Sequence, residues 1–497
     1  MFRLSCIVLL LLSSGGQLLF SADRFEFTPS ARQAYEKVMS LRFEEAKSLL
    51  SQIKAADPGN LVVHHIENYI DFLTVYIDEN EGEFRRLEKN KDGRLERIKL
   101  GDPASPYYLY SQADIRLQWA FIRIKFGDYL SAFNEVSKAY KLLEENQQKF
   151  PNFLPNKKDL GILHALVGTI PDNYKWGVKL LGGLNGTIDQ GRREIEEVIR
   201  YAKTNDFIFE EETLAMYAFL LLYLGNEGDT AWMTLKSSKL NPTNNPMACF
   251  ILSSLAMRTG RNDEAIRLLQ QAPKGKGLKT FPLLDFMLGN AKLRRLDKDA
   301  DVAFQQYLQH YKGQNGIKET YQKLSWHALI QGDMGKYESY RRQAISKGNA
   351  SGDGDNNALK EAQSGRKPNL ALIKARLLFD GGYYSKAHQL LAQQSLSSFD
   401  EKVDRLEYTY RFGRVLHQLH KYSDALRLYK TTIDQGKNEP YYFACNAALQ
   451  TGFIYEVQKD YSNARAFFEM CLSINPQEHS TSLHHQAKTG LARIKKR

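Results

Sequence analysis

Residues Cys445–Glu478 read CNAALQTGFIYEVQKDYSNARAFFEMCLSINPQE, and this stretch decides the fold. A small residue stands in each of its two helix-forming halves, Gly452 in the first and Ala464 in the second. Small side chains let two packed helices approach closely, and the aromatic rings of Tyr455 and Phe468 can fill the gaps that remain. The stretch therefore predicts two antiparallel helices that pack against each other as a hairpin.

The same arrangement recurs along the chain. Asn475-Pro476 ends the second helix of the last copy, because proline disfavours helical geometry in the residue before it. The preceding copy carries Gly413 and Ala425 at the matching positions. Stacked hairpins of this kind bury a continuous core only together, so the sequence predicts a helical array. Further copies start near Phe27, Ala113, Glu212, Pro246, Phe281, Lys318 and Pro368, with Ala46, Ala265 and Ala387 as the small residue of the second helix in the clearest of them.

Gly452, Tyr455, Ala464, Phe468 and Pro476 stand at the spacings G-x2-Y, A-x3-F and terminal P. They resemble the signature of the tetratricopeptide-repeat (TPR) family. The resemblance implies an all-α fold, an α-solenoid of antiparallel helix pairs wound into a right-handed superhelix. It also implies a scaffold or adaptor, not an enzyme and without cofactor, that binds another protein or peptide on its concave surface.

A second, local resemblance concerns residues 150–200, which are rich in Gly, Leu and Pro. This segment is similar to one in the tetratricopeptide family that includes inclusion-body-clearance proteins, and it implies no catalytic residues. Its glycines predict close approach of helices. A phosphate-cradling loop is not expected, because G-x-x-x-x-G-K-[ST] is absent. Thr187 or Asp189 is expected to cap the helix that starts near Gln190.

The first 22 residues differ from the rest of the chain. Arg3 precedes an apolar run from Leu4 to Leu12 that is too short to span a bilayer, which is typical of a secretory signal with cleavage near Ala22. Retention of this segment as a membrane anchor is the alternative. We therefore expect an exported protein, located in the periplasm or outer-membrane vicinity of a Gram-negative-type bacterium, without an integral membrane span after signal removal.

Composition and the regularity of the repeats divide the chain into consecutive parts. They are a secretory signal peptide (1–22), an N-terminal TPR-like helical region (23–147), an irregular Gly/Pro-containing helical segment (148–205), a central TPR array (206–348), a flexible loop (349–367) and a C-terminal TPR array (368–497).

The charge is positive but scattered. Lys plus Arg number 68 against 57 Asp plus Glu, a formal net charge of +11. Because we find neither a recognised nucleic-acid-binding module nor a basic stripe, we expect no nucleic acid among the partners and a preference for acidic ones. No catalytic motif and no metal site is expected: Asp353-x-Asp355-x-Asn357 lacks the glycine and glutamate of a calcium loop.

The TPR resemblance also implies a binding surface, formed by the first helix of each unit. Its residues are basic and aromatic, which suits an extended peptide with acidic side chains or a free carboxylate, since arginine pairs bidentately with carboxylates. The alternative is that they are ordinary solvated residues. The candidate peptide-binding residues are Arg258, Lys292, Trp326, Arg376, Tyr410, Arg414, His417, Asn446 and Phe453.

Two further alternatives stay open. A glycan-capture protein associated with the outer membrane, with TPR-like helices, is the alternative function, although the regular repeats and the presence of only 4 Trp argue against it. Cys445 and Cys471 are predicted to lie near each other across their hairpin, either as a disulfide or as two packed thiols.

Overall fold

The computed structural model describes residues 23–169, 183–225 and 227–495. Within these ranges it is α-helical and contains no strand, only an isolated bridge between Arg24 and Asn60. The predicted all-α solenoid is confirmed. None of the described helices is long and apolar enough to cross a membrane. The predicted signal, residues 1–22, lies outside the described residues.

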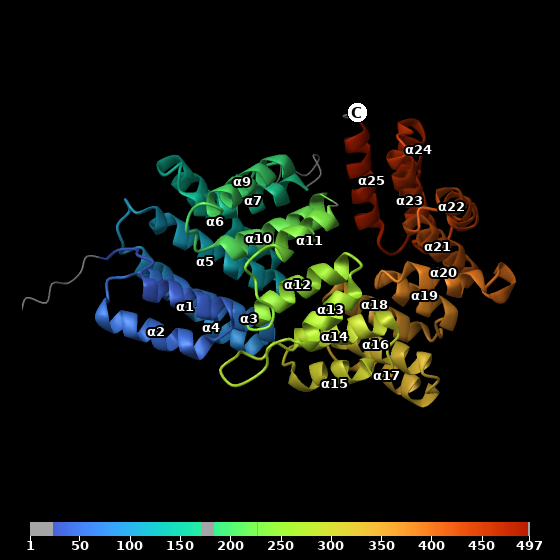
Figure 1. Ribbon diagram of the computed structural model, residues 1–497, viewed down its shortest axis with the longest axis horizontal. Coiled ribbons are helices and arrows are strands. Elements are labelled where there is room, and N and C mark those ends of the chain that lie inside the picture. The colour runs from blue at the N-terminus through green and yellow to red at the C-terminus, as the bar shows by residue number, and fades with distance from the viewer. Residues whose placement is uncertain (1–22, 170–182, 226, 496–497) are drawn as a thin grey trace, which may run out of the picture.

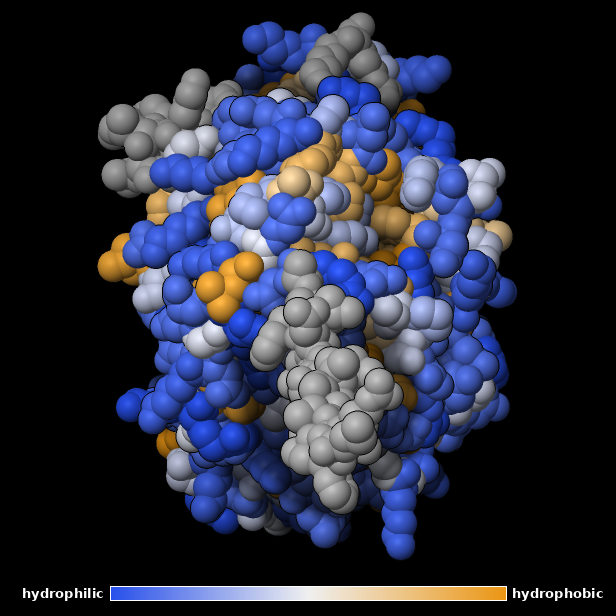
Figure 2. Space-filling view, turned by 90° about the vertical axis from the view of Figure 1, so that its left-hand side faces the viewer, coloured by the Kyte–Doolittle hydropathy of each residue, from blue (hydrophilic) through white to orange (hydrophobic). Residues whose placement is uncertain are grey.

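The helices follow one another as antiparallel pairs along a curved path (Figure 1). The first pairs lie on the left of this view, the pairs that follow run across the top, the next ones lie at the bottom centre, and the last pairs rise on the right. The face in Figure 2 is mostly hydrophilic, with apolar residues gathered in its upper half. The N-terminal pairs are α1 (Pro29–Met39) with α2 (Phe43–Ala56), α3 (Val62–Asp78) with α4 (Glu81–Ile98), α5 (Pro106–Lys125) with α6 (Tyr129–Lys149), and α7 (Leu154–Gly168) with α9 (Ile188–Ala202).

The central and C-terminal pairs continue the array. A π-helical turn, η1 (Leu221–Gly225), extends α10, and α25 (Ser480–Lys495) closes the stack. The central pairs are α10 (Glu210–Leu220) with α11 (Gly228–Lys236), α12 (Pro246–Arg258) with α13 (Asn262–Gln270), α14 (Leu283–Arg295) with α15 (Ala300–His310), and α16 (Ile317–Ile330) with α17 (Met334–Ser346). The C-terminal pairs are α19 (Leu370–Asp380) with α20 (Tyr384–Ala392), followed by the short 3-10 helix η2 (Leu396–Ser398), then α21 (Lys402–Gln418) with α22 (Tyr422–Gly436), and α23 (Phe443–Val457) with α24 (Tyr461–Ser473).

The predicted packing of small residues against aromatic ones is confirmed. A Cβ added at Gly452 would lie 2.6 Å from ring carbons of Phe468, and one added at Gly413 would lie 2.8 Å from the ring of Tyr429. The paired helices therefore touch where the signature places its small residues. The second-helix alanines are all fully buried: Ala46, Ala265, Ala387, Ala425 and Ala464.

The glycine-rich segment brings α7 and α9 together, as expected. A Cβ at Gly191 would lie 2.1 Å from the carbonyl oxygen of Gly161, so the two backbones are nearly in contact. Thr187 caps α9 by accepting a hydrogen bond from the backbone N–H of Gln190 (3.0 Å).

The predicted flexible loop at residues 349–367 is wrong, because a helix, α18 (Asp353–Ser364), occupies most of it and packs on α16 and α17. Its Asp355 carboxylate accepts hydrogen bonds from the backbone N–H groups of Gly316 (2.6 Å) and Glu319 (3.0 Å) at the start of α16. Ala358 and Ala362 of α18 are buried. Tertiary contacts thus order a segment whose polar composition resembles a linker.

The cysteines of the last repeat are packed thiols. Cys445 and Cys471 are buried and are not joined by a disulfide, and their sulfur atoms lie 3.6 Å apart. The disulfide alternative is therefore not the one found.

A buried ionic group, which we call the Lys158 cluster, joins helices of the N-terminal half. Lys158 Nζ lies 2.8 Å from Glu212 Oε1 and 2.9 Å from Asp159 Oδ1, and the lysine side chain is fully buried. Nearby, Asp114 bonds His65 Nε2 at 2.6 Å. Burial works against the Lys158 ammonium, but the carboxylates of Asp159, Glu212 and Asp114 outweigh it and raise the pKa of Lys158. The cluster ties α3, α5, α7 and α10 together.

The stability of this half should depend on pH through Asp159. Burial, with repulsion from Asp114 and Glu212, raises the pKa of Asp159 from 3.8 to about 7. Between these two values the folded chain holds a proton that the unfolded chain releases, so the unfolding free energy falls as the pH rises from about 4 to 7. Between about pH 4 and 7 this effect lowers the unfolding free energy of the wild type by up to about 4 kcal/mol, and we expect Asp159→Asn to abolish it. Urea unfolding at several pH values measures the difference. Parallel pH profiles for the variant and the wild type would contradict it.

Candidate binding groove

Four adjoining hollows follow the inner side of the curved array, and together we call them the inner groove. The widest, about 930 Å³, lies between α12 and α14 on one side and α19–α21 on the other, and we call it the chamber. The other three measure about 470, 550 and 290 Å³. Their walls overlap, since Arg414 lines three of the four hollows and Arg376 lines two. They form one continuous surface.

The chamber exists because the array bends sharply after α18. Helix α19 packs back against α14, and the turns before α13 and α20 meet: a Cβ at Gly382 would lie 2.2 Å from the carbonyl oxygen of Gly260. Tyr383 donates a hydrogen bond to Asp263 Oδ1 (2.8 Å) across the same contact. Repeats that are distant in sequence thus form opposite walls.

Arginine dominates the charge of the chamber and of the 550 and 290 Å³ hollows. Their walls contain six arginines and no lysine, against three carboxylates, so positive charge is in excess by three when histidines are neutral. Arginine binds carboxylate and phosphate oxygens through two parallel hydrogen bonds. The arginines are Arg258, Arg294, Arg376, Arg411, Arg414 and Arg493, and the carboxylates are Glu319, Asp380 and Glu456.

Aromatic rings hold several of these guanidinium groups in place. Arg414 lies 4.6 Å from the ring centroid of Phe379, and Arg258 lies 4.9 Å from that of Tyr223. Arg376 lies 4.9 Å from the ring centroid of Trp326. Such stacking orients a cation without neutralising it, so its hydrogen-bond donors stay available to a ligand.

Tyr410 organises the centre of the groove. Its side chain is buried, and its hydroxyl oxygen accepts hydrogen bonds from Arg414 (2.9 Å) and Asn446 (2.8 Å). Burial, with repulsion from Arg414 and His420, lowers the pKa of His417 to about 4, so that histidine adds no positive charge near neutral pH. Arginines therefore carry the positive charge here.

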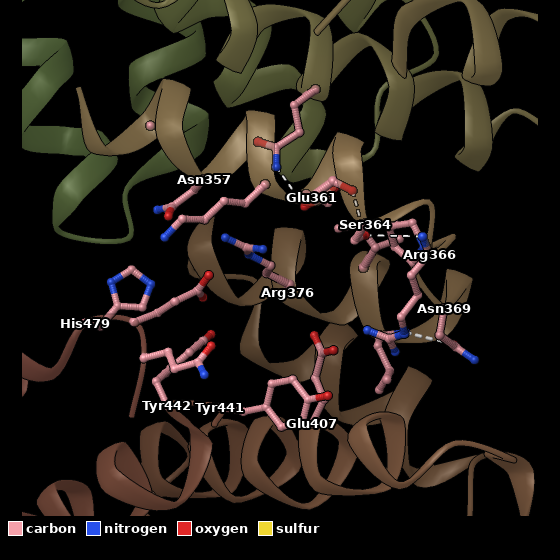
Figure 3. Close-up of a pocket in the computed structure, with 18 of the residues that line it drawn as sticks. Asn357, Glu361, Ser364, Arg366, Asn369, Arg376, Glu407, Tyr441, Tyr442 and His479 are labelled. Atoms are coloured by element: carbon pink, nitrogen blue, oxygen red, sulfur yellow. Dashed lines mark hydrogen bonds between the residues drawn. The ribbon is translucent and has the colours of Figure 1, made fainter. Parts of the chain in front are cut away.

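The 470 Å³ hollow is polar and of mixed charge (Figure 3). Glu361 of α18, Arg376 of α19 and Glu407 of α21 lie around it, with Tyr442 and His479 on the remaining side. Both signs of charge are represented about equally in its wall. No group of His, Cys, Asp and Glu side chains within the described ranges could hold a metal ion.

The structure brings most of the sequence-predicted binding residues together. Lys292 and Trp326 are the exceptions: Lys292 pairs with Asp299 (2.5 Å) within its own repeat, and buried Trp326 donates to Glu361 of α18 (2.6 Å). Whether the others bind a ligand stays a prediction. Those that line the inner groove are Arg258, Arg376, Tyr410, Arg414, His417, Asn446 and Phe453.

Arg294 lines the chamber, although the repeat spacing predicted Lys292 from this helix. Helix α14 presents Phe286, Asn290 and Arg294 to the chamber, at intervals of one turn. Lys292 stands two residues earlier than Arg294, about 200° around the helix. The four-residue spacing from Phe286 is the signal that would have found Arg294.

No family model and no curated protein matches the chain. Solved structures do match. A human IFIT1 dimer with m7Gppp-AAAA is 16% identical, with 89% of each chain covered and a TM-score of 0.29. The same dimer with PPP-AAAA is 14% identical, again with 89% of each chain covered, at a TM-score of 0.30. A monomeric IFIT1 mutant with Gppp-AAAA is 11% identical over 80% of this chain and 95% of that chain, also at 0.30.

These scores are too low to carry an argument about a ligand. They nevertheless correct one expectation. The exclusion of nucleic acid rested on the lack of a recognised module, yet IFIT1 is found with capped and triphosphate RNA. The prediction of no nucleic-acid partner is therefore wrong.

Proposed function

We propose that the chain is a non-catalytic scaffold whose inner groove binds an extended, acidic peptide segment of a partner protein. The excess of six arginines over three carboxylates in the chamber and in the 550 and 290 Å³ hollows carries this proposal. Export to a periplasm or the outer-membrane vicinity is part of the same proposal and rests on the apolar run of residues 4–12.

Two details favour a peptide over single-stranded RNA. RNA-binding surfaces of this kind need free aromatic faces on which bases stack. Here guanidinium groups already lie over the rings of Tyr223, Phe379 and Phe453, which leaves fewer free faces, those of Phe250 and Phe286 among them. The carboxylates Asp380 and Glu456 would also repel a phosphate backbone, whereas the N–H groups of a peptide can donate to them.

The test measures binding of labelled probes by fluorescence anisotropy. The probes are an alternating Glu-Phe octapeptide, its Lys-Phe counterpart and an eight-nucleotide single-stranded RNA. We expect the acidic peptide to bind and Arg376→Ala/Arg414→Ala to weaken it about tenfold or more, because each arginine loses charge-assisted hydrogen bonds. Arg427→Ala is the control, since this exposed arginine of α22 forms its one ion pair within the described ranges with Asp424 on its own helix.

Each other outcome decides against the proposal. Equal binding of both peptides would mean that the arginines do not select charge. RNA binding that is tighter than peptide binding and sensitive to the same double variant would assign the groove to nucleic acid instead.

A further inference from the structure

None of the three arginines that line the chamber has a carboxylate partner among the described residues, and only Arg414 is held by a side-chain oxygen, that of Tyr410. Arg294 Nη1 donates to the backbone oxygen of Met257 (3.2 Å), and no carboxylate of the described chain lies within 4.0 Å of its guanidinium. Arg258 also lacks such a partner among the described residues and rests on the ring of Tyr223. Both side chains line the chamber.

The surroundings of half-buried Arg294 disfavour its positive charge. Burial lowers the pKa of Arg294, and the positive charge of Arg258 adds to the effect, while Asp380 and Glu319 offset it only in part. The adjacent Arg295 shows the usual arrangement, since it lies 2.6 Å from Asp297 and 3.0 Å from Asp263. A buried cation without a carboxylate partner is destabilising unless something else supplies the negative charge.

Apolar side chains share the wall of the chamber with polar and charged ones. Side chains of α12 and α14 contribute Phe250, Phe286 and Met287, and η1 contributes Leu222. A volume of about 930 Å³ is within the usual range for pockets that hold small ligands or side chains.

We propose that Arg258 and Arg294 form an oxyanion-binding subsite for a carboxylate or phosphate group carried on an apolar body. The proposal rests on the proposed function in that the groove is the ligand site, and it names the group that anchors the ligand. Arg294 supplies the buried donors, Arg258 closes the site from the solvent side, and the aromatic wall holds the apolar body.

The test uses benzoate, phenyl phosphate and inorganic phosphate, with benzamide as the neutral probe. Binding to the full chain is followed by calorimetric titration and by melting temperature. We expect benzoate or phenyl phosphate to bind and to raise the melting temperature, and benzamide to do neither. Tighter binding of benzoate would identify the anion as a carboxylate, and tighter binding of phenyl phosphate would identify it as a phosphate. Binding of inorganic phosphate alone would contradict the need for an apolar body.

Arg294→Met and Arg295→Met, on neighbouring positions of α14, separate function from structure. Arg294→Met should raise the melting temperature of the free protein by about 1 °C, since it removes an unpaired cation, and weaken probe binding about tenfold or more. Arg295→Met should lower the melting temperature and leave binding unchanged. A lowered melting temperature with unchanged binding in Arg294→Met would overturn the subsite.

The two proposals can fail separately. If the acidic octapeptide binds through Arg376 and Arg414 while no probe binds, the subsite is wrong and the proposed function stands. If the probes bind and no peptide does, the chamber is a small-molecule site and the scaffold proposal is wrong.

Discussion

Lys158→Ala should destabilise the N-terminal half by about 3–5 kcal/mol. The change leaves Asp159 and Glu212 buried without the ammonium that lies within 3 Å of each. Urea unfolding at pH 7.5 measures the effect, and hydrogen exchange should locate it in α5, α7 and α10.

The adjacent residue supplies the control for this substitution. Lys157 pairs with Glu197 at the surface, so Lys157→Ala should cost no more than about 1 kcal/mol. The gap between the two variants should narrow toward pH 4, where protonated carboxylates no longer need the cation. Similar losses for Lys157→Ala and Lys158→Ala at pH 7.5 would mean that the Lys158 cluster does not hold these helices together.

Gly452→Ala should destabilise the last repeat by about 1–3 kcal/mol, because the new methyl group would lie 2.6 Å from the Phe468 ring. The same change at Gly93 should stabilise the protein by about 0.5–1 kcal/mol, since Gly93 lies inside α4 with no atom within 4 Å of the added carbon. Urea unfolding followed by circular dichroism reports both values. If the two substitutions change stability in the same direction, close packing at Gly452 is not what holds α23 against α24.

The hairpins could be predicted from sequence because each one depends on residues close together in the chain. Gly452 and Phe468 belong to one hairpin, and their spacing alone indicates that they touch. The candidate groove followed for the same reason, since Arg376 and Arg414 occupy inner positions of correctly placed helices. In α14 the predicted repeat register differed from the one in the structure, so the prediction placed Lys292 on the inner face where Arg294 lies.

The remaining features depend on contacts between distant parts of the chain. In the sequence, Lys158 and Glu212 look like ordinary charged residues of two amphipathic helices. They are buried together because α7 packs on α10. Asp355 accepts a hydrogen bond from the backbone of α16, which is far away in sequence. Because this contact cannot be seen in the local sequence, the polar residues of α18 predicted a loop. The bend that brings Gly382 against Gly260 leaves no local pattern at all.

That bend has a consequence for how this protein can change over evolutionary time. In most repeat proteins each unit touches only its neighbours, so whole units can be gained or lost without harm to the rest. Here the contact between Gly260 and Gly382 fixes the number of residues that can lie between them. The part of the array from α13 to α20 therefore behaves as a closed ring whose repeat number is fixed.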